Sequence, residues 1–149
     1  METTAYKLAL IGIAAQQPIP CKRPLINHKV SAGFASPALD FIEKDLDLNL
    51  FLVSHKEATY YFEVSGHCMT GIGIFDKDVI VVDRSIDATH GNLVLAVIDE
   101  EYTLKRLYQK FGRIELHPEN PMFEPIRLTE GQELQIWGVI TGNVRKYKV

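Results

Sequence analysis

The chain has little cysteine, no long hydrophobic run and no excess of basic residues. Its two cysteines, Cys21 and Cys68, are too few for a disulfide framework, so we expect a protein of the reducing cytoplasm. The most apolar early stretch, residues 8–15, is too short to span a bilayer and has no basic region before it, which argues against a membrane segment or a signal peptide. A net charge of −3 disfavours direct binding to nucleic acid, including sequence-specific binding.

Side chains that commonly bind metals are also sparse. Five histidines occur without the spacing typical of metal ligands, so we expect no metal site and no cofactor. Gly71-Ile72-Gly73 lacks the third glycine and the strand-to-helix setting of a phosphate-binding loop, and it is interpreted as a turn. With 149 residues, 46% hydrophobic and 23% charged, the chain suits one globular domain with a moderate core.

The hydrophobic pattern predicts a mainly β fold with one or two short helices. Short runs rich in β-branched and aromatic residues alternate with turn residues, and the continuous apolar run at 79–82 suggests a strand buried on both faces. Residues 99–101 are a tight connection of the kind expected in a hairpin. The predicted strands cover 6–13, 60–64, 79–82, 93–98, 102–107, 113–117, 123–128, 134–140 and 144–147, with a turn at Gly142-Asn143 between the last two.

One helix is predicted from residue 36. Ser36 can cap the free N–H groups, and Pro37 suits the first helical position. Leu39, Ile42 and Leu46 follow at spacings of three and four, which indicates a short amphipathic helix that packs on the sheet.

The first 32 residues differ from the rest of the chain. Pro18, Pro20 and Pro24 favour extended or turn conformations and break regular structure. We interpret residues 1–32 as an extended arm that precedes a β-rich domain of residues 33–149. The alternative is an edge strand of the main domain, near residues 8–13, followed by a loop.

Two places carry residues suited to hydrolysis. Cys68 follows Ser65-Gly66 at the end of a predicted strand, where a turn would present a nucleophile. Lys105 lies among apolar neighbours on another predicted strand, and a lysine whose ammonium is desolvated can serve as a base. The alternatives are a buried structural thiol and a solvated lysine on an edge strand. A pair between Cys68 and His67 is disfavoured, because adjacent side chains usually point apart.

Three segments resemble, in order and spacing, segments of the LexA/UmuD self-cleaving proteins, peptidase family S24. They are residues 32–38 (AGFASPA), 65–69 (SGHCM) and 103–107 (TLKRL). The resemblance covers about residues 28–141. It implies a compact β domain, a nucleophile at Cys68, a general base at Lys105 and a scissile bond between Ala32 and Gly33. The family's nucleophile is serine. Cysteine is a departure that we expect to slow cleavage, because sulfur is larger and the oxyanion donors are placed for an oxygen nucleophile.

The resemblance also implies partners. UmuD-like members form homodimers, cleave themselves when a RecA filament on single-stranded DNA stimulates them, and then act as accessory subunits of a UmuC-type translesion polymerase in the SOS response. The alternative is a binding module that regulates a polymerase without cleavage. A LexA-like repressor is disfavoured because no DNA-binding domain precedes residue 33, and a membrane signal peptidase because no membrane anchor is present.

Overall fold

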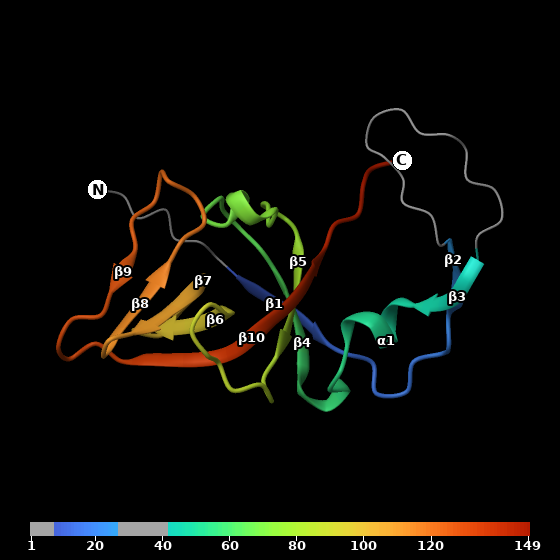
Figure 1. Cartoon of the computed structure of the whole chain (residues 1–149), viewed down its shortest axis with the longest axis horizontal. Coiled ribbons are helices and arrows are strands. Elements are labelled where there is room, and N and C mark those ends of the chain that lie inside the picture. Colours follow the sequence, from blue (N-terminus) through green and yellow to red (C-terminus); the bar gives the residue numbers. More distant parts are fainter. Residues whose placement is uncertain (1–7, 27–41) are drawn as a thin grey trace.

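A curled sheet of eight antiparallel strands dominates the computed structural model, which describes residues 8–26 and 42–149 (Figure 1). Across the sheet the strands run in the order β1-β4-β5-β10-β6-β7-β8-β9. The predicted mainly β class is therefore confirmed. The strands are β1 (Ala9–Ile13), β4 (Thr59–Glu63), β5 (Val79–Asp83), β6 (Leu93–Ile98), β7 (Glu101–Lys110), β8 (Arg113–His117), β9 (Ile126–Arg127) and β10 (Leu134–Val144).

Two tight hairpins hold β6, β7 and β8 together. Asp99 and Glu100, between β6 and β7, have φ of 48° and 68°, and Phe111 and Gly112, between β7 and β8, have φ of 53° and 71°. Positive φ at both central residues is the geometry of a type I′ turn, whose twist matches that of the flanking strands. The hairpin predicted at residues 99–101 is confirmed.

Two apolar clusters form the core. Alternation along β7 places Leu104 in a cluster with Cys68 and Phe62, whereas Leu107 belongs to a second cluster. The predicted fully buried strand is also present, because Ile80, Val81 and Val82 of β5 are each at most 1% exposed. The other members of the second cluster are Val94, Ala96, Leu116 and Val139.

Two predicted strand boundaries near the C-terminus are wrong. The predicted turn at Gly142-Asn143 and the separate strand 144–147 are replaced by one strand, β10, that runs on to Val144. A register shift against β5 between Ile140 and Gly142 lets the strand bend there without ending. The strand predicted at 123–128 shrinks to Ile126–Arg127, directly after Pro125, which has no N–H to donate to a ladder.

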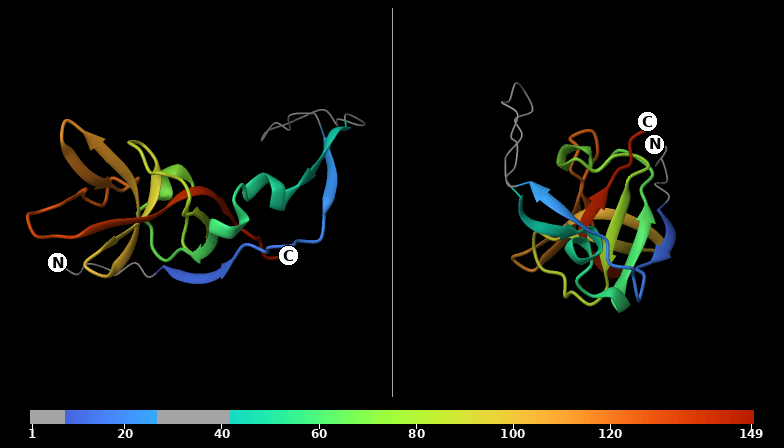
Figure 2. Two further views of the ribbon diagram at one scale, coloured as in Figure 1. Left: turned by 90° about the horizontal axis from the view of Figure 1, so that it is seen from below. Right: turned by 90° about the vertical axis from the view of Figure 1, so that its right-hand side faces the viewer.

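A separate two-stranded sheet stands apart from the larger one (Figures 1 and 2). It pairs β2 (Lys22–Ile26) with β3 (Ile42–Asp47). Pro24, predicted to break regular structure, lies within β2. Both strands of a two-stranded sheet are edge strands, where proline is tolerated.

The predicted helix is wrong in its described part. Residues 42–47 form β3, because pairing with a segment about twenty residues earlier overrides the local helical spacing of Ile42 and Leu46. Helix α1 (Leu48–Leu52) begins only after Asp47, whose side chain accepts a hydrogen bond from the backbone N–H of Asn49 at 2.9 Å. Ser36, Pro37 and Leu39 lie outside the described residues.

Three short helices complete the described chain: α1 and two 3-10 turns, η1 (Lys56–Ala58) and η2 (Thr70–Ile72). None of the helices in residues 8–26 and 42–149 is long and apolar enough to cross a membrane. The turn predicted at Gly71–Gly73 is confirmed, because η2 ends at Gly73 in the left-handed conformation.

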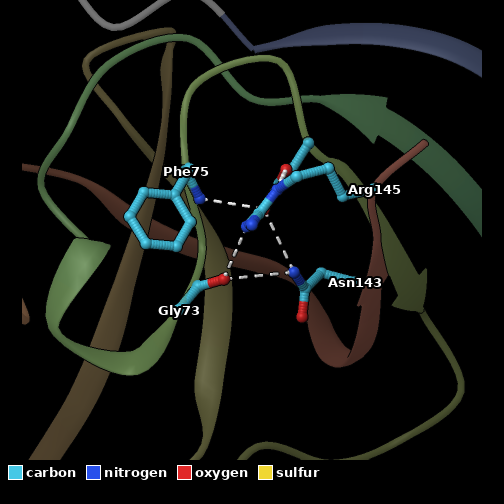
Figure 3. A network of polar contacts seen from close by, with 5 residues as sticks. Gly73, Phe75, Asn143 and Arg145 are labelled. Atoms are coloured by element: carbon cyan, nitrogen blue, oxygen red, sulfur yellow. Dashed lines mark hydrogen bonds and ion pairs between the residues drawn. The ribbon is translucent and has the colours of Figure 1, made fainter. Parts of the chain in front are cut away.

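A buried carboxylate ties the loop before β5 to the end of β10. The Asp78 side chain is 0% exposed and accepts hydrogen bonds from Arg145 Nε at 2.6 Å, Arg145 Nη2 at 2.7 Å and Asn143 Nδ2 at 3.1 Å. Figure 3 shows Arg145 and Asn143 converging on the carbonyl of Gly73, with Phe75 alongside. The hydrogen bond from Arg145 lowers the pKa of Asp78, and burial opposes this with a smaller effect.

Arg145→Ala is expected to lower the free energy of unfolding several times more than the loss of an exposed arginine does, because it leaves a buried carboxylate short of its main donor. Since the folded pKa of Asp78 is lowered, this contribution is complete above the unfolded pKa and is lost as the pH falls through the folded pKa. The difference between wild type and variant should therefore shrink below about pH 4. Urea unfolding at neutral and acidic pH measures both effects.

Arg127→Ala is the matched control. Its side chain is 77% exposed and its contact with Glu115 is 3.4 Å, so its loss should change stability by less than about 0.5 kcal/mol. Equal stabilities of the Arg145→Ala chain and the control would contradict a structural role for the Asp78 network.

Candidate functional site

Cys68 lies in the turn between β4 and η2. The turn is made possible by Gly66, whose φ of 111° is strained for residues with a Cβ. Its backbone N–H donates to Asp76 Oδ1 at 2.9 Å. The turn predicted at Ser65-Gly66 is confirmed, and it places Cys68 in the core cluster that contains Phe62 and Leu104.

The connection between β8 and β9 fixes this turn from outside. The N–H of Glu119 donates to the Cys68 carbonyl at 2.8 Å, and the N–H of Gly71 donates to the Glu119 carbonyl at 2.7 Å. A Cβ on Gly71 would lie 2.4 Å from that carbonyl oxygen, so this close approach requires glycine. Asn120 Nδ2 adds a bond to the His67 carbonyl at 2.7 Å. These supports lie about fifty residues away in sequence, and no sequence pattern predicted them.

The structure brings Lys105 to Cys68. Lys105 Nζ lies 3.4 Å from Cys68 Sγ, and both residues are buried, at 4% and 6% exposure. Lys105 is on β7, which pairs with β6 on one side and β8 on the other, so the alternative of a solvated lysine on an edge strand is excluded. His67, in contrast, is exposed.

Neighbouring polar atoms hold the amine in place. Lys105 Nζ donates to Thr103 Oγ1 at 2.9 Å and to the Leu104 carbonyl at 3.2 Å, and the Cys68 thiol donates to the same carbonyl at 3.6 Å. Thr103 was not predicted as a site residue. Its place on the same strand face as Lys105, two residues away, was the signal that could have identified it.

A small cavity adjoins Cys68. Its volume of about 10 Å³ leaves room for about one water molecule. Ala32 and Gly33, the predicted scissile pair, lie outside the described residues, so their position relative to Cys68 stays a prediction. The cavity is lined by Leu8, Val64, Ser65, Gly66, Cys68, Met69 and Leu104.

Within the described ranges, no three histidine, cysteine, aspartate or glutamate side chains gather as a metal site would require. The described part of the site offers a thiol, an amine, the hydroxyl of Thr103 and backbone groups. A buried thiol beside a buried amine, at the end of a strand, defines a candidate hydrolytic site of the nucleophile–lysine class.

Comparison with known proteins places the chain in a family. Residues 24–141 match the Peptidase S24-like family. The chain is 36% identical over 139 residues to protein SamA of Salmonella typhimurium, covering 93% of this chain and 96% of SamA. It is 39% identical over 127 residues to protein MucA of Escherichia coli, covering 85% and 86%. The chain therefore belongs to the Peptidase S24-like family.

A related repressor shares part of the chain. The LexA repressor of Syntrophotalea carbinolica is 43% identical over 89 residues, which are 60% of this chain and 44% of the repressor. The resemblance to LexA/UmuD proteins noted in the sequence is thus confirmed at the level of the family. The replacement of the family's serine by Cys68 leaves the identity of the nucleophile as a prediction.

Proposed function

We propose that this chain cleaves its own backbone between Ala32 and Gly33, with Cys68 as the nucleophile and Lys105 as the general base. The observation that carries the proposal is the 3.4 Å contact between Lys105 Nζ and Cys68 Sγ in a buried site. Membership of the Peptidase S24-like family supports it, because self-cleavage is the general activity of that family.

The chemistry proceeds in two steps. Lys105, as the general base, takes the proton of Cys68. The thiolate adds to the carbonyl carbon of Ala32, and the peptide bond breaks as the ammonium protonates the nitrogen of Gly33. Water then attacks the carbonyl carbon of the thioester, and one of its protons passes to the neutral amine of Lys105. The carbon–sulfur bond breaks, which releases the carboxyl group of Ala32 and regenerates the thiolate.

The surroundings of the amine support this cycle. A lysine ammonium has three N–H donors, and Thr103 Oγ1, the Leu104 carbonyl and Cys68 Sγ provide three acceptors. We infer that Thr103 and Leu104 orient the amine toward the sulfur in both protonation states.

The wider role follows from the family resemblance. We propose a cytoplasmic UmuD-like protein of the SOS response, whose residues 1–32 are removed on cleavage. A RecA filament on single-stranded DNA would stimulate cleavage by favouring the state in which the scissile segment is docked at Cys68. The remaining homodimer of residues 33–149 would then serve as accessory subunit of a UmuC-type error-prone polymerase.

A second candidate function is a polymerase-regulating module that does not cleave. Two observations favour it: cysteine occupies the position of the family's serine, and the cavity beside Cys68 measures only about 10 Å³. In that case residues 1–32 would stay attached, and the chain would act by binding alone.

One experiment separates the two functions. The purified full chain is incubated with RecA filaments on single-stranded DNA and, separately, at alkaline pH, and its products are identified by intact-mass spectrometry. The proposed peptidase yields two fragments, residues 1–32 and 33–149. A cut at another bond contradicts the assigned site, and an intact chain under both conditions supports the binding module.

A further inference from the structure

The edge of the large sheet next to Cys68 is covered by β1. This strand pairs with β4 from Ala9 opposite Glu63 to Ile13 opposite Tyr60. Directly before the strand, the half-buried Leu8 packs against the core cluster that contains Cys68 and forms one wall of the small cavity. A segment from the far N-terminus thus lies beside the thiol.

The cavity is too small for the reaction proposed above. Attack requires a peptide carbonyl within about 3–3.5 Å of the sulfur. A space of about 10 Å³ holds about one water molecule, so a peptide unit that docked there would need more room. Val64, Met69 and Leu104 are 6%, 1% and 3% exposed within the core, whereas Leu8 precedes an edge strand.

Toward the end near Cys68, that strand exposes its apolar side chains. Leu10 and Ile11 are each 54% exposed, and the register against β4 shifts between Leu10 and Gly12. The other end is anchored: Ala14 is 2% exposed, and its N–H donates to the Thr59 carbonyl at 2.8 Å. Apart from the packing of Leu8, little apolar burial resists opening from this end, and Ala14 would act as the hinge.

We propose that the edge of β4 is the docking strand for the scissile segment around Ala32 and Gly33, and that β1 with Leu8 occupies this edge until it peels away. An extended peptide adds to an open sheet edge through backbone hydrogen bonds, and departure of β1 would open both the edge and the cavity at Cys68. The docking part of this inference rests on the proposed function. The covering of Cys68 by β1 does not.

Alkylation of Cys68 in the full chain tests the covering. Cys21 is exposed and serves as an internal reference, with both sites measured by peptide mass after brief treatment with iodoacetamide. Leu8→Ala removes one wall of the cavity. The double variant replaces both Leu10 and Ile11 with proline. Successive N–H groups point to opposite sides of a strand, so one of these two residues directs its N–H toward β4. Its replacement by proline removes a backbone hydrogen bond to β4. Both variants should raise the ratio of Cys68 to Cys21 alkylation roughly tenfold.

Two controls separate local opening from damage elsewhere. Ile19→Pro lies outside β1 at a residue that is 87% exposed, and Leu107→Ala weakens the second core cluster without touching β1. Neither should change the alkylation ratio. An unchanged ratio in the β1 variants, or an equal rise in the Leu107→Ala chain, overturns the proposal.

Cleavage then tests docking. If the wild type cleaves at Ala32–Gly33, the β1 double variant should cleave roughly tenfold faster, because the competing strand is gone. Faster alkylation without faster cleavage overturns docking on β4. If no chain cleaves at all, the proposed peptidase function fails instead, and the alkylation ratio alone decides whether β1 covers Cys68.

Discussion

Cys68→Ala is expected to abolish cleavage at Ala32–Gly33, and Cys68→Ser is expected to accelerate it. Alanine removes the attacking atom, so the rate should fall at least about a thousandfold. Serine restores the smaller oxygen nucleophile for which the family's oxyanion donors are placed, and the rate should rise, by about tenfold. The measurement is the rate at which the fragment of residues 33–149 appears at alkaline pH.

Cys21→Ser is the control for the loss of a thiol, because Cys21 is exposed. Its cleavage rate should equal that of the wild type. A serine variant at position 68 whose rate stays flat or falls would count against the dyad, and an alanine variant that still cleaves at the wild-type rate would exclude Cys68 as the nucleophile.

Replacing Lys105 has the second large expected effect. Lys105→Ala should slow cleavage by about 10²–10⁴-fold, the usual contribution of a general acid–base group. Lys105→Arg should be nearly as slow, because arginine keeps the positive charge but does not release its proton at accessible pH. The arginine variant therefore separates proton transfer from simple electrostatic attraction to the sulfur.

Lys110→Ala is the matched control, since Lys110 is exposed at the end of the same strand, β7. It should leave the cleavage rate unchanged. Thermal melting of each chain checks that the fold persists, because Lys105 is buried and its replacement alters packing. A folded Lys105→Arg chain that cleaves at the wild-type rate would show that Lys105 is not the base.

Local patterns predicted the strands whose partners are near in sequence. The alternation along residues 102–107 and the tight connection at 99–101 identified the β6–β7 hairpin, because a type I′ turn is encoded by its own few residues. The buried strand at 79–82 was visible from its unbroken apolar run. Long-range pairing overrides the local pattern elsewhere: Ile42 and Leu46 have helical spacing, but pairing with residues 22–26 makes a strand of 42–47.

The candidate site was predictable only in part. Composition and spacing alone left Cys68 and Lys105 as isolated possibilities, and the family resemblance suggested that they meet. The supports at Glu119 and Asn120, and the wall formed by Leu8, depend on folding of the whole sheet. No local pattern encodes contacts between segments so far apart in the chain.

Above all, we propose that Cys68 and Lys105 act together to cut one bond in this chain. The most direct test of this proposal is a side-by-side intact-mass measurement of the wild type, Cys68→Ala and Lys105→Arg after the same alkaline incubation. We expect fragments of residues 1–32 and 33–149 from the wild type and essentially uncut chains from both variants. The same two fragments from either variant at the wild-type rate, or a wild-type chain cut at a different bond, would contradict it.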